Sequence, residues 1–114
     1  MNRIKSRIWV EALLRRCQSQ GKFGAVLKTG ADEAGAVFVA INRLNGTLDL
    51  LAPPPGPSTN DAGERWFQKT FPAPVSSIEL NTFIERQKRF DQDFWVVEIE
   101  TREGFADLSL APTD

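Results

Sequence analysis

Residues 36–52 read AVFVAINRLNGTLDLLA, and this stretch decides the fold. An Asn-Gly pair separates its two apolar runs. This arrangement is typical of a hairpin with a two-residue type I′ turn, in which both central residues take positive φ. The turn predicts that Ile41 lies opposite Leu50 and that Ala40 lies opposite Leu51. Apolar residues on both faces of the first run further indicate a central strand that is covered on both sides.

Two segments have the apolar periodicity of helices. The first extends from Ser6 to Gln20, with Ser6 as the expected N-cap and Gly21 as the expected terminator. Its apolar stripe, spaced at i, i+3, i+4 and i+7, comprises Val10, Leu13, Leu14 and Cys17. The second helix begins with a capping box at residues 76–79 and extends to about Phe90. Its apolar stripe comprises Leu80, Phe83 and Ile84.

The segments on either side of the hairpin predict two strands and a short helix. Residues 23–28 and 36–43 are the strands expected before the turn. The run of five residues 53–57, which contains four prolines, ends the strand after the turn and begins an exposed connector. Residues 61–64, Asp-Ala-Gly-Glu, have capping-box spacing, which predicts a short helix that carries Trp66, Phe67 and Phe71.

The C-terminal region predicts a second hairpin. Apolar residues at 95, 97 and 99 alternate with Glu98 and Glu100. A two-residue turn at Glu103-Gly104 would pair Ile99 with Leu108 and Val97 with Leu110, so that apolar side chains meet. The element order is then α-β-β-β-α-α-β-β. We therefore expect one α+β domain, residues 1–114, whose mainly antiparallel sheet of about five strands has its helices packed on one face.

The composition narrows the possible classes of function. The 114 residues are 41% hydrophobic and 25% charged, as in ordinary globular domains. The chain has no histidine and a single cysteine, which excludes Ser-His-Asp and Cys-His catalysis and any zinc site of histidines or several cysteines within one chain. No apolar run approaches the ~20 residues that span a bilayer. No secretion signal is evident, so we expect a cytoplasmic protein without membrane contact.

The charge is unevenly distributed along the chain. Residues 1–28 contain seven basic residues and one acidic residue, a net charge of +6, whereas the remainder carries −7. Basic residues on a helix and its flanking arm can bind phosphates or carboxylates. Trp9 and Arg16 are seven residues apart, on one flank of the apolar stripe, where a tryptophan and an arginine suit stacking and anion binding. The candidate nucleic-acid or partner-binding residues are Arg3, Lys5, Arg7, Trp9, Arg15 and Arg16.

A second candidate site consists of carboxylates on the last hairpin. The expected register places Asp107 directly opposite Glu100, with Glu98 two residues along the same face. Opposed like charges cost energy unless a cation neutralises them. These three carboxylates would suit Mg²⁺, Mn²⁺ or Ca²⁺. The alternatives are neutralisation by the basic helix and an ordinary solvent-facing acidic strand.

Three segments together resemble a known family. They are residues 8–17 (IWVEALLRRC), 34–46 (AGAVFVAINRLNG) and 89–100 (RFDQDFWVVEIE). The chain is similar over nearly its whole length to a family of small alphaproteobacterial proteins of unknown function. Members of that family often have Lys at the position of Ala40, Asp at Asn45 and Pro at Gln92. The resemblance implies a bacterial cytoplasmic protein and carries over no reaction or ligand, and any role of a lysine at position 40 would be absent here.

Three hypotheses of function stay open. The preferred one is a binding module without catalytic activity or cofactor, whose basic N-terminal segment binds RNA or an acidic protein surface. The second is a small metal-dependent enzyme that uses the three carboxylates and a divalent cation. The third is a homo-oligomeric interaction protein that uses exposed aromatic side chains, for which the candidates are Trp66, Phe67, Phe71 and Phe94.

Overall fold

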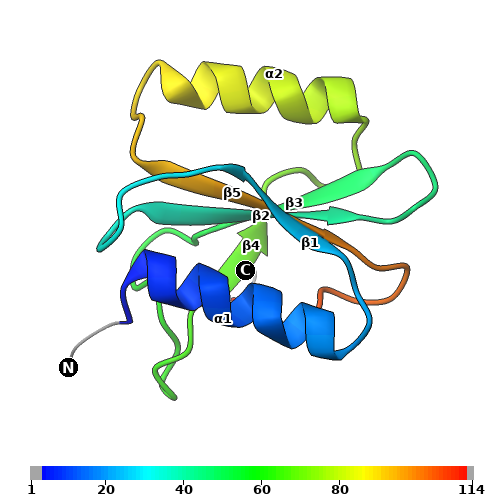
Figure 1. The fold of residues 1–114 in the computed structure, drawn as a ribbon. Coiled ribbons are helices and arrows are strands. Elements are labelled where there is room, and N and C mark those ends of the chain that lie inside the picture. The colour runs from blue at the N-terminus through cyan, green and yellow to red at the C-terminus, as the bar shows by residue number, and fades with distance from the viewer. Residues whose placement is uncertain (1–3, 113–114) are drawn as a thin grey trace.

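The fold is a six-stranded sheet between two helices (Figure 1). It is seen in a computed structural model that describes residues 4–112. The elements in chain order are α1 (Ser6–Ser19), β1 (Gly24–Lys28), β2 (Ala36–Asn42), β3 (Leu48–Ala52), β4 (Trp66–Lys69), α2 (Ser77–Lys88), β5 (Phe94–Glu100) and β6 (Ser109–Leu110). The α+β class is confirmed. The order differs from the expected one in that a strand, β4, stands where a short helix was predicted.

The sheet is mixed, and the expectation of a mainly antiparallel sheet is wrong. The strand order is β1-β5-β2-β3-β4-β6. The pairs β1–β5, β2–β3 and β3–β4 are antiparallel, whereas β2–β5 and β4–β6 are parallel. The crossover through α2 returns β5 between β1 and β2. Because both edges of β5 are then occupied, β6 cannot pair with it, and the predicted C-terminal hairpin does not form.

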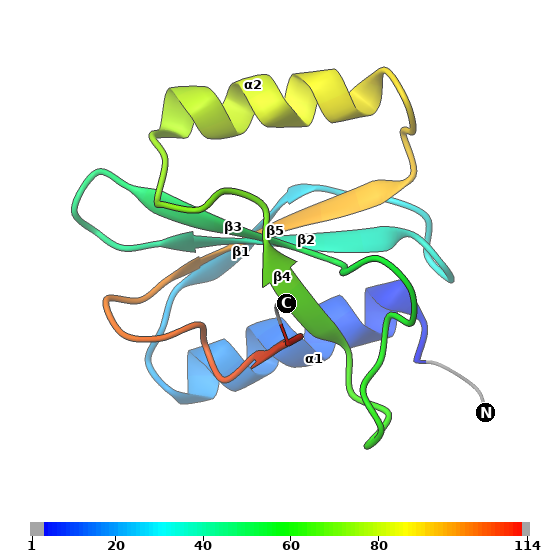
Figure 2. The ribbon, with the colours of Figure 1, turned by 180° about the vertical axis from the view of Figure 1, so that it is seen from behind.

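The two helices cover opposite faces of the sheet, which corrects the expectation of a single covered face (Figures 1 and 2). The α1 side has a core that includes Val10, Leu13 and Cys17 from the helix and Val39, Val97 and Ile99 from the sheet. The α2 side has a second core that includes Leu80 and Ile84 from the helix and Phe38, Leu50, Phe94 and Val96 from the sheet. Both faces of β2 are therefore buried, as its apolar pattern predicts.

The turn between β2 and β3 differs from the predicted type I′ turn. The backbone hydrogen bond from Arg43 N to Thr47 O, at 3.0 Å, encloses three residues. Leu44 and Gly46 have φ of 63° and 90°, while Asn45 uses its Oδ1 to accept a hydrogen bond from Thr47 N. The longer turn shifts the register by one residue, so that Ala40 lies opposite Leu50 and Ile41 lies opposite Asp49.

The register shift places a charged side chain inside the protein. Cross-strand partners share a face of the sheet, so Asp49 lies with Ile41 on the α1 side. Asp49 is only 4% exposed. Its Oδ2 accepts a hydrogen bond from Arg43 Nε at 2.8 Å and lies 2.6 Å from Arg43 Nη2. The hydrogen-bonded arginine compensates the cost of burying this carboxylate.

The helix termini follow the sequence signals in part. Ser76 caps α2 in a reciprocal capping box with Glu79, as predicted. Gly21, with φ of 73°, ends α1 in a Schellman motif in which Lys22 N donates to Cys17 O at 2.8 Å. Ser6 is not the N-cap of α1, because it is the first helical residue and makes no capping hydrogen bond. Its buried Oγ donates instead to Gly35 O, at 2.6 Å.

The segment before β4 is a turn and not the predicted helix. Asn60 Oδ1 accepts hydrogen bonds from Ala62 N and Glu64 N, at 3.0 and 2.9 Å. An asparagine that bonds to the backbone of the next few residues stabilises a turn at the expense of a helix. The turn lets residues 66–69 extend as β4, which buries Phe67 beneath α1.

Candidate functional site

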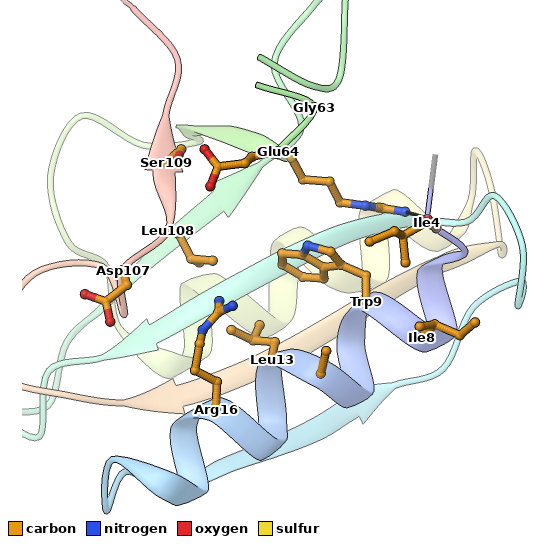
Figure 3. Close-up of a pocket in the computed structure, with 12 residues that line it drawn as sticks. Ile4, Ile8, Trp9, Leu13, Arg16, Gly63, Glu64, Asp107, Leu108 and Ser109 are labelled. Atoms are coloured by element: carbon orange, nitrogen blue, oxygen red, sulfur yellow. Dashed lines mark hydrogen bonds between the residues drawn. The ribbon is translucent and has the colours of Figure 1, made fainter. Parts of the chain in front are cut away.

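A pocket of about 290 Å³ lies beside α1. Three segments form it, namely the outer flank of α1, the turn before β4 and residues 107–109 (Figure 3). Its apolar lining includes Trp9, Leu13 and Leu108. The other lining residues are Ile4, Ile8, Ala12, Arg16, Gly63, Glu64, Arg65, Asp107 and Ser109.

Contacts between distant segments hold the Trp9 wall of the pocket in place. The Trp9 ring packs on Phe67 of β4, with 5.6 Å between ring centroids. The Arg65 guanidinium lies 5.5 Å from the centre of the Trp9 ring. Arg65 Nη2 also donates to Ile4 O at 2.9 Å and to Ser6 Oγ at 3.2 Å. The turn before β4 is thus fastened to the start of α1, and the pocket wall is preorganised.

Charged side chains of both signs surround the apolar floor. The Arg16 side chain reaches from α1 toward Leu108 and Trp9 (Figure 3). Asp107 Oδ2 accepts a hydrogen bond from Gln20 Nε2 at 3.1 Å, and Glu64 Oε1 accepts one from Asn60 Nδ2 at 3.1 Å. The two carboxylates lie on the wall opposite α1. The pocket therefore offers an apolar surface, the guanidinium groups of Arg16 and Arg65, and the carboxylates of Glu64 and Asp107 as hydrogen-bond acceptors.

The first half of the predicted basic segment is paired within the protein. Lys5 Nζ lies 3.4 Å from Glu33 Oε1. Arg7 Nε donates to Asp32 Oδ1 at 3.0 Å, and this hydrogen bond together with the charge of Asp32 raises the pKa of Arg7 above its ordinary value. The loop between β1 and β2 thus neutralises both cations. Arg3 lies outside the described residues.

The second half of the basic segment is open. Arg15 and Arg16 are exposed on the last turns of α1, and neither forms an ion pair with any residue in the range 4–112. Lys22, just beyond the helix, donates to the neutral Gln20 Oε1 at 3.2 Å. Trp9 and Arg16 line the same pocket, which agrees with the shared helix flank predicted from their spacing. The unpaired positive charge of the basic segment therefore lies at this end of α1, where Arg16 lines the pocket.

The structure does not bring the predicted carboxylate cluster together. Glu98 and Glu100 of β5 lie on the α2 side of the sheet, which they share with their cross-strand partners on β2, Ala40 and Asn42. Glu98 Oε2 accepts a hydrogen bond from Asn42 Nδ2 at 3.3 Å. Asp107 lies beside the end of α1, on the other face. The predicted register between these strands is wrong because β6 pairs with β4. Within residues 4–112 no three His, Cys, Asp or Glu side chains are placed to share a metal ion.

The aromatic side chains named for self-association are largely internal. Phe67 and Phe94 are each 1% exposed, and Phe71 packs against Phe83 with 5.8 Å between ring centroids. Leu27 of the edge strand β1 and Phe23 just before it are exposed, but a bulge between Val26 and Lys28 interrupts the ladder. Lys28 Nζ turns inward to donate to Phe94 O at 3.0 Å. A short, bulged edge with an inward-pointing lysine discourages pairing with a second chain.

Cys17 belongs to the α1-side core, as its place in the apolar stripe predicts. It is 2% exposed, and burial raises the pKa of its thiol. The cations of Arg16 and Lys22 oppose this rise but do not reverse it. A buried thiol with a raised pKa has little thiolate character, so Cys17 is a structural residue.

Several pocket residues were not predicted from the sequence. Arg65, Glu64 and Leu108 lie in turns or short strands far from α1 along the chain. Their one local signal was the capping-box spacing of residues 61–64, which suggested a helix. Ala106 and Asp107 have φ of 55° and 61°, a conformation that is uncommon for residues other than glycine. This bend directs Leu108 toward the pocket, and no local sequence signal predicts it.

A model of a family described as protein of unknown function (DUF1491) matches residues 4–108. The chain belongs to the DUF1491 family. This confirms the resemblance found in the three sequence segments. No curated protein matches the chain.

Solved structures of related proteins share this fold. The solution structure of a protein from A. tumefaciens is 40% identical, covers 98% of both chains and has a TM-score of 0.82. A crystal structure of a DUF1491 protein from Caulobacter crescentus CB15 is 34% identical, covers 95% of this chain and 99% of that one, and has a TM-score of 0.75. An NMR structure from the same organism, 35% identical, has coverages of 96% and 97% and a TM-score of 0.73.

Both source organisms are alphaproteobacteria, in agreement with the resemblance. Within the part of the chain that is described, no helix is long and apolar enough to cross a bilayer.

Proposed function

We propose that this DUF1491 protein is a binding module without catalytic activity that takes an acidic segment of a partner protein at the C-terminal end of α1. The observation that carries the proposal is the difference between the two halves of the basic segment. Lys5 and Arg7 are paired with Glu33 and Asp32, whereas Arg15 and Arg16 are open, and Arg16 lines a pocket. Unpaired cations next to an apolar pocket suit a partner with carboxylates and an apolar contact.

The charges around the pocket favour an acidic protein segment over RNA. A nucleic-acid strand requires a cationic groove that follows several phosphates. Here the open cations beside the pocket lie at one end of α1, and Glu64 and Asp107 also line the pocket. Those carboxylates would repel a continuous phosphate backbone, whereas a peptide can place its N–H groups against them and direct its own carboxylates toward Arg16.

The chemistry available at the pocket supports binding without catalysis. The chain has no histidine to act as a base near neutral pH. Its cysteine is buried beneath α1 with a raised pKa. The pocket therefore presents side chains that recognise a ligand, and the described residues around it include no activated nucleophile.

Binding of labelled acidic peptides, measured by fluorescence anisotropy in parallel with a single-stranded RNA of matched charge, tests the proposal. The double charge reversal Arg15→Glu/Arg16→Glu should weaken peptide binding by roughly tenfold or more at low salt. Added salt should weaken binding of the unmodified protein, because exposed charges are screened. Arg86→Glu/Arg89→Glu is the matched control, since both arginines are exposed at the end of α2 on the opposite face.

The thermal unfolding of both variants should match that of the unmodified protein, because all four arginines are exposed. Equal weakening by the two double variants would overturn the proposal, because binding would then reflect net charge alone. Tighter binding of RNA than of every acidic peptide would overturn it in favour of a nucleic-acid module.

A further inference from the structure

We propose that the pocket beside α1 anchors one apolar side chain of the acidic segment, while a carboxylate next to that side chain pairs with Arg16. This inference rests on the proposed function and adds that the partner segment carries an apolar residue at its centre. The partner is then a segment with a single apolar residue between acidic ones, and that apolar residue is buried in the pocket.

The size and surface of the pocket leave room for an apolar side chain. Its volume of about 290 Å³ lies at the lower limit of pockets that hold small organic ligands. Trp9 and Leu13 form its floor on the α1 side, and Leu108 faces them (Figure 3). An aromatic ring with aliphatic neighbours is a typical anchor site at protein interfaces.

The pocket has an apolar end and a charged end, which gives the ligand a direction. Ile4 and Ile8 lie on one side of Trp9, while Arg16 and Asp107 lie toward the other (Figure 3). Ile4 and Ile8 are 57% and 51% exposed, so they offer further apolar surface without a partner in the described chain. A ligand carboxylate at the charged end would lie near Arg16, and its apolar group would then extend over Trp9.

The walls are held in position without a ligand. Arg65 fastens the turn before β4 to Ile4 and Ser6, and Phe67 supports the Trp9 ring from the sheet side. Because these contacts already order the wall, binding needs little additional ordering of the protein. A preorganised apolar site of this kind binds a ligand whose apolar group fills it more tightly than a ligand that leaves it empty.

Two acidic peptides that differ only at their centre test the inference. Both have the form Glu-Asp-X-Asp-Glu with a fluorescent label, and X is Leu in one and Gly in the other. The Leu peptide should bind more tightly by roughly tenfold or more, since burying a leucine side chain contributes about that factor. In ¹⁵N-resolved NMR spectra the indole N–H signal of Trp9 should shift with the Leu peptide. The signals of Trp66 and Trp95 should stay in place, because their Nε1–H groups donate to Pro57 O and Ala31 O.

A variant that fills the pocket separates the contribution of the apolar contact to binding affinity from the contribution of charge. Ala12→Leu adds a side chain to the pocket lining, and it should remove the preference for Leu over Gly while the Gly peptide still binds. Gln18→Leu adds the same side chain to an exposed position on the opposite flank of α1 and should keep the preference. Leucine is a good helix former at both positions, so both variants should fold.

The outcomes distinguish this inference from the proposed function. Equal binding of both peptides, lost on Arg15→Glu/Arg16→Glu, would overturn the anchor pocket and keep the acidic-segment module. Absence of binding to both peptides would overturn both proposals. A Leu preference that persists in Ala12→Leu would place the apolar contact elsewhere and overturn the assignment of the pocket.

Discussion

The two faces of the sheet are built in different ways. On the α2 side, the helix is capped by its own Ser76–Glu79 box and packs on the sheet through apolar residues that include Leu80 and Ile84. On the α1 side, no side chain caps the helix at Lys5. Hydrogen bonds with distant segments hold its first turn, because Ser6 Oγ donates to Gly35 O and accepts from Arg65 Nη2. The pocket that we propose for partner binding lies on the α1 side (Figure 3).

The proposed function would divide the two faces between stability on the α2 side and recognition on the α1 side. A locally capped helix on an apolar core needs few specific long-range polar contacts. A face that carries buried charge and a preorganised pocket needs several, because each buried polar group requires a partner. We therefore expect substitutions on the α2 side to change stability alone, and polar substitutions on the α1 side to change both stability and binding.

The largest effect is expected from Arg43→Met. This variant leaves the buried Asp49 carboxylate without its partner, and it should lower the free energy of unfolding by about 3–5 kcal/mol in urea titrations. The second change Asp49→Leu, added to Arg43→Met, should recover most of the loss. Lys88→Met is the control, because the exposed Lys88–Glu85 pair contributes at most about 1 kcal/mol. A loss in Arg43→Met as small as that of the control would contradict the buried ion pair.

The next largest effect is expected from Leu80→Ala, which removes apolar contacts in the α2-side core. We expect it to cost about 2–4 kcal/mol of unfolding free energy and to leave peptide binding by the folded protein unchanged. Ile78→Ala on the same helix should change stability little, because Ile78 is 76% exposed. If Leu80→Ala weakened binding under conditions where it is fully folded, the proposed independence of the two faces would be wrong.

A smaller effect separates the two serines at the helix starts. Ser76→Ala should cost about 1 kcal/mol through loss of the cap and leave binding unchanged. Ser6→Ala should cost about 1–2 kcal/mol, because it removes the buried hydrogen bond to Gly35 O and an acceptor for Arg65. It should also weaken binding of the Leu peptide, since Arg65 orders the pocket wall. Identical binding by the two variants would show that the wall does not depend on this contact.

The smallest expected effect is the pH dependence that arises from Cys17. Burial raises its pKa in the folded protein, whereas the unfolded thiol ionises near pH 8.5. Its contribution to stability is therefore complete below about pH 8.5 and is lost as the pH rises through the folded value. Urea titrations between pH 7 and 10 should show a steeper decline for the unmodified protein than for Cys17→Ala. Parallel curves would mean that the thiol ionises equally in both states.

Local sequence signals predicted the elements more reliably than their arrangement. The helix over residues 6–20, the capping box at 76–79 and the buried strand after residue 35 depend on residues within a few positions of one another. The shared helix flank of Trp9 and Arg16 follows from the same periodicity. The helix predicted after residue 60 does not form. The capping-box spacing suggested a helix, but the Asn60 side chain accepts hydrogen bonds from the backbone of a turn instead.

The arrangement was decided by contacts between residues far apart in the chain. The insertion of β5 between β1 and β2 made the sheet mixed and separated Asp107 from Glu98 and Glu100. A one-residue change in the β2–β3 turn buried Asp49, which Arg43 then had to neutralise. The sequence by itself determined an α+β domain with an amphipathic basic helix. The tertiary structure alone decided which cations stayed open and where the pocket formed, because partners for charges and walls for cavities come from other segments.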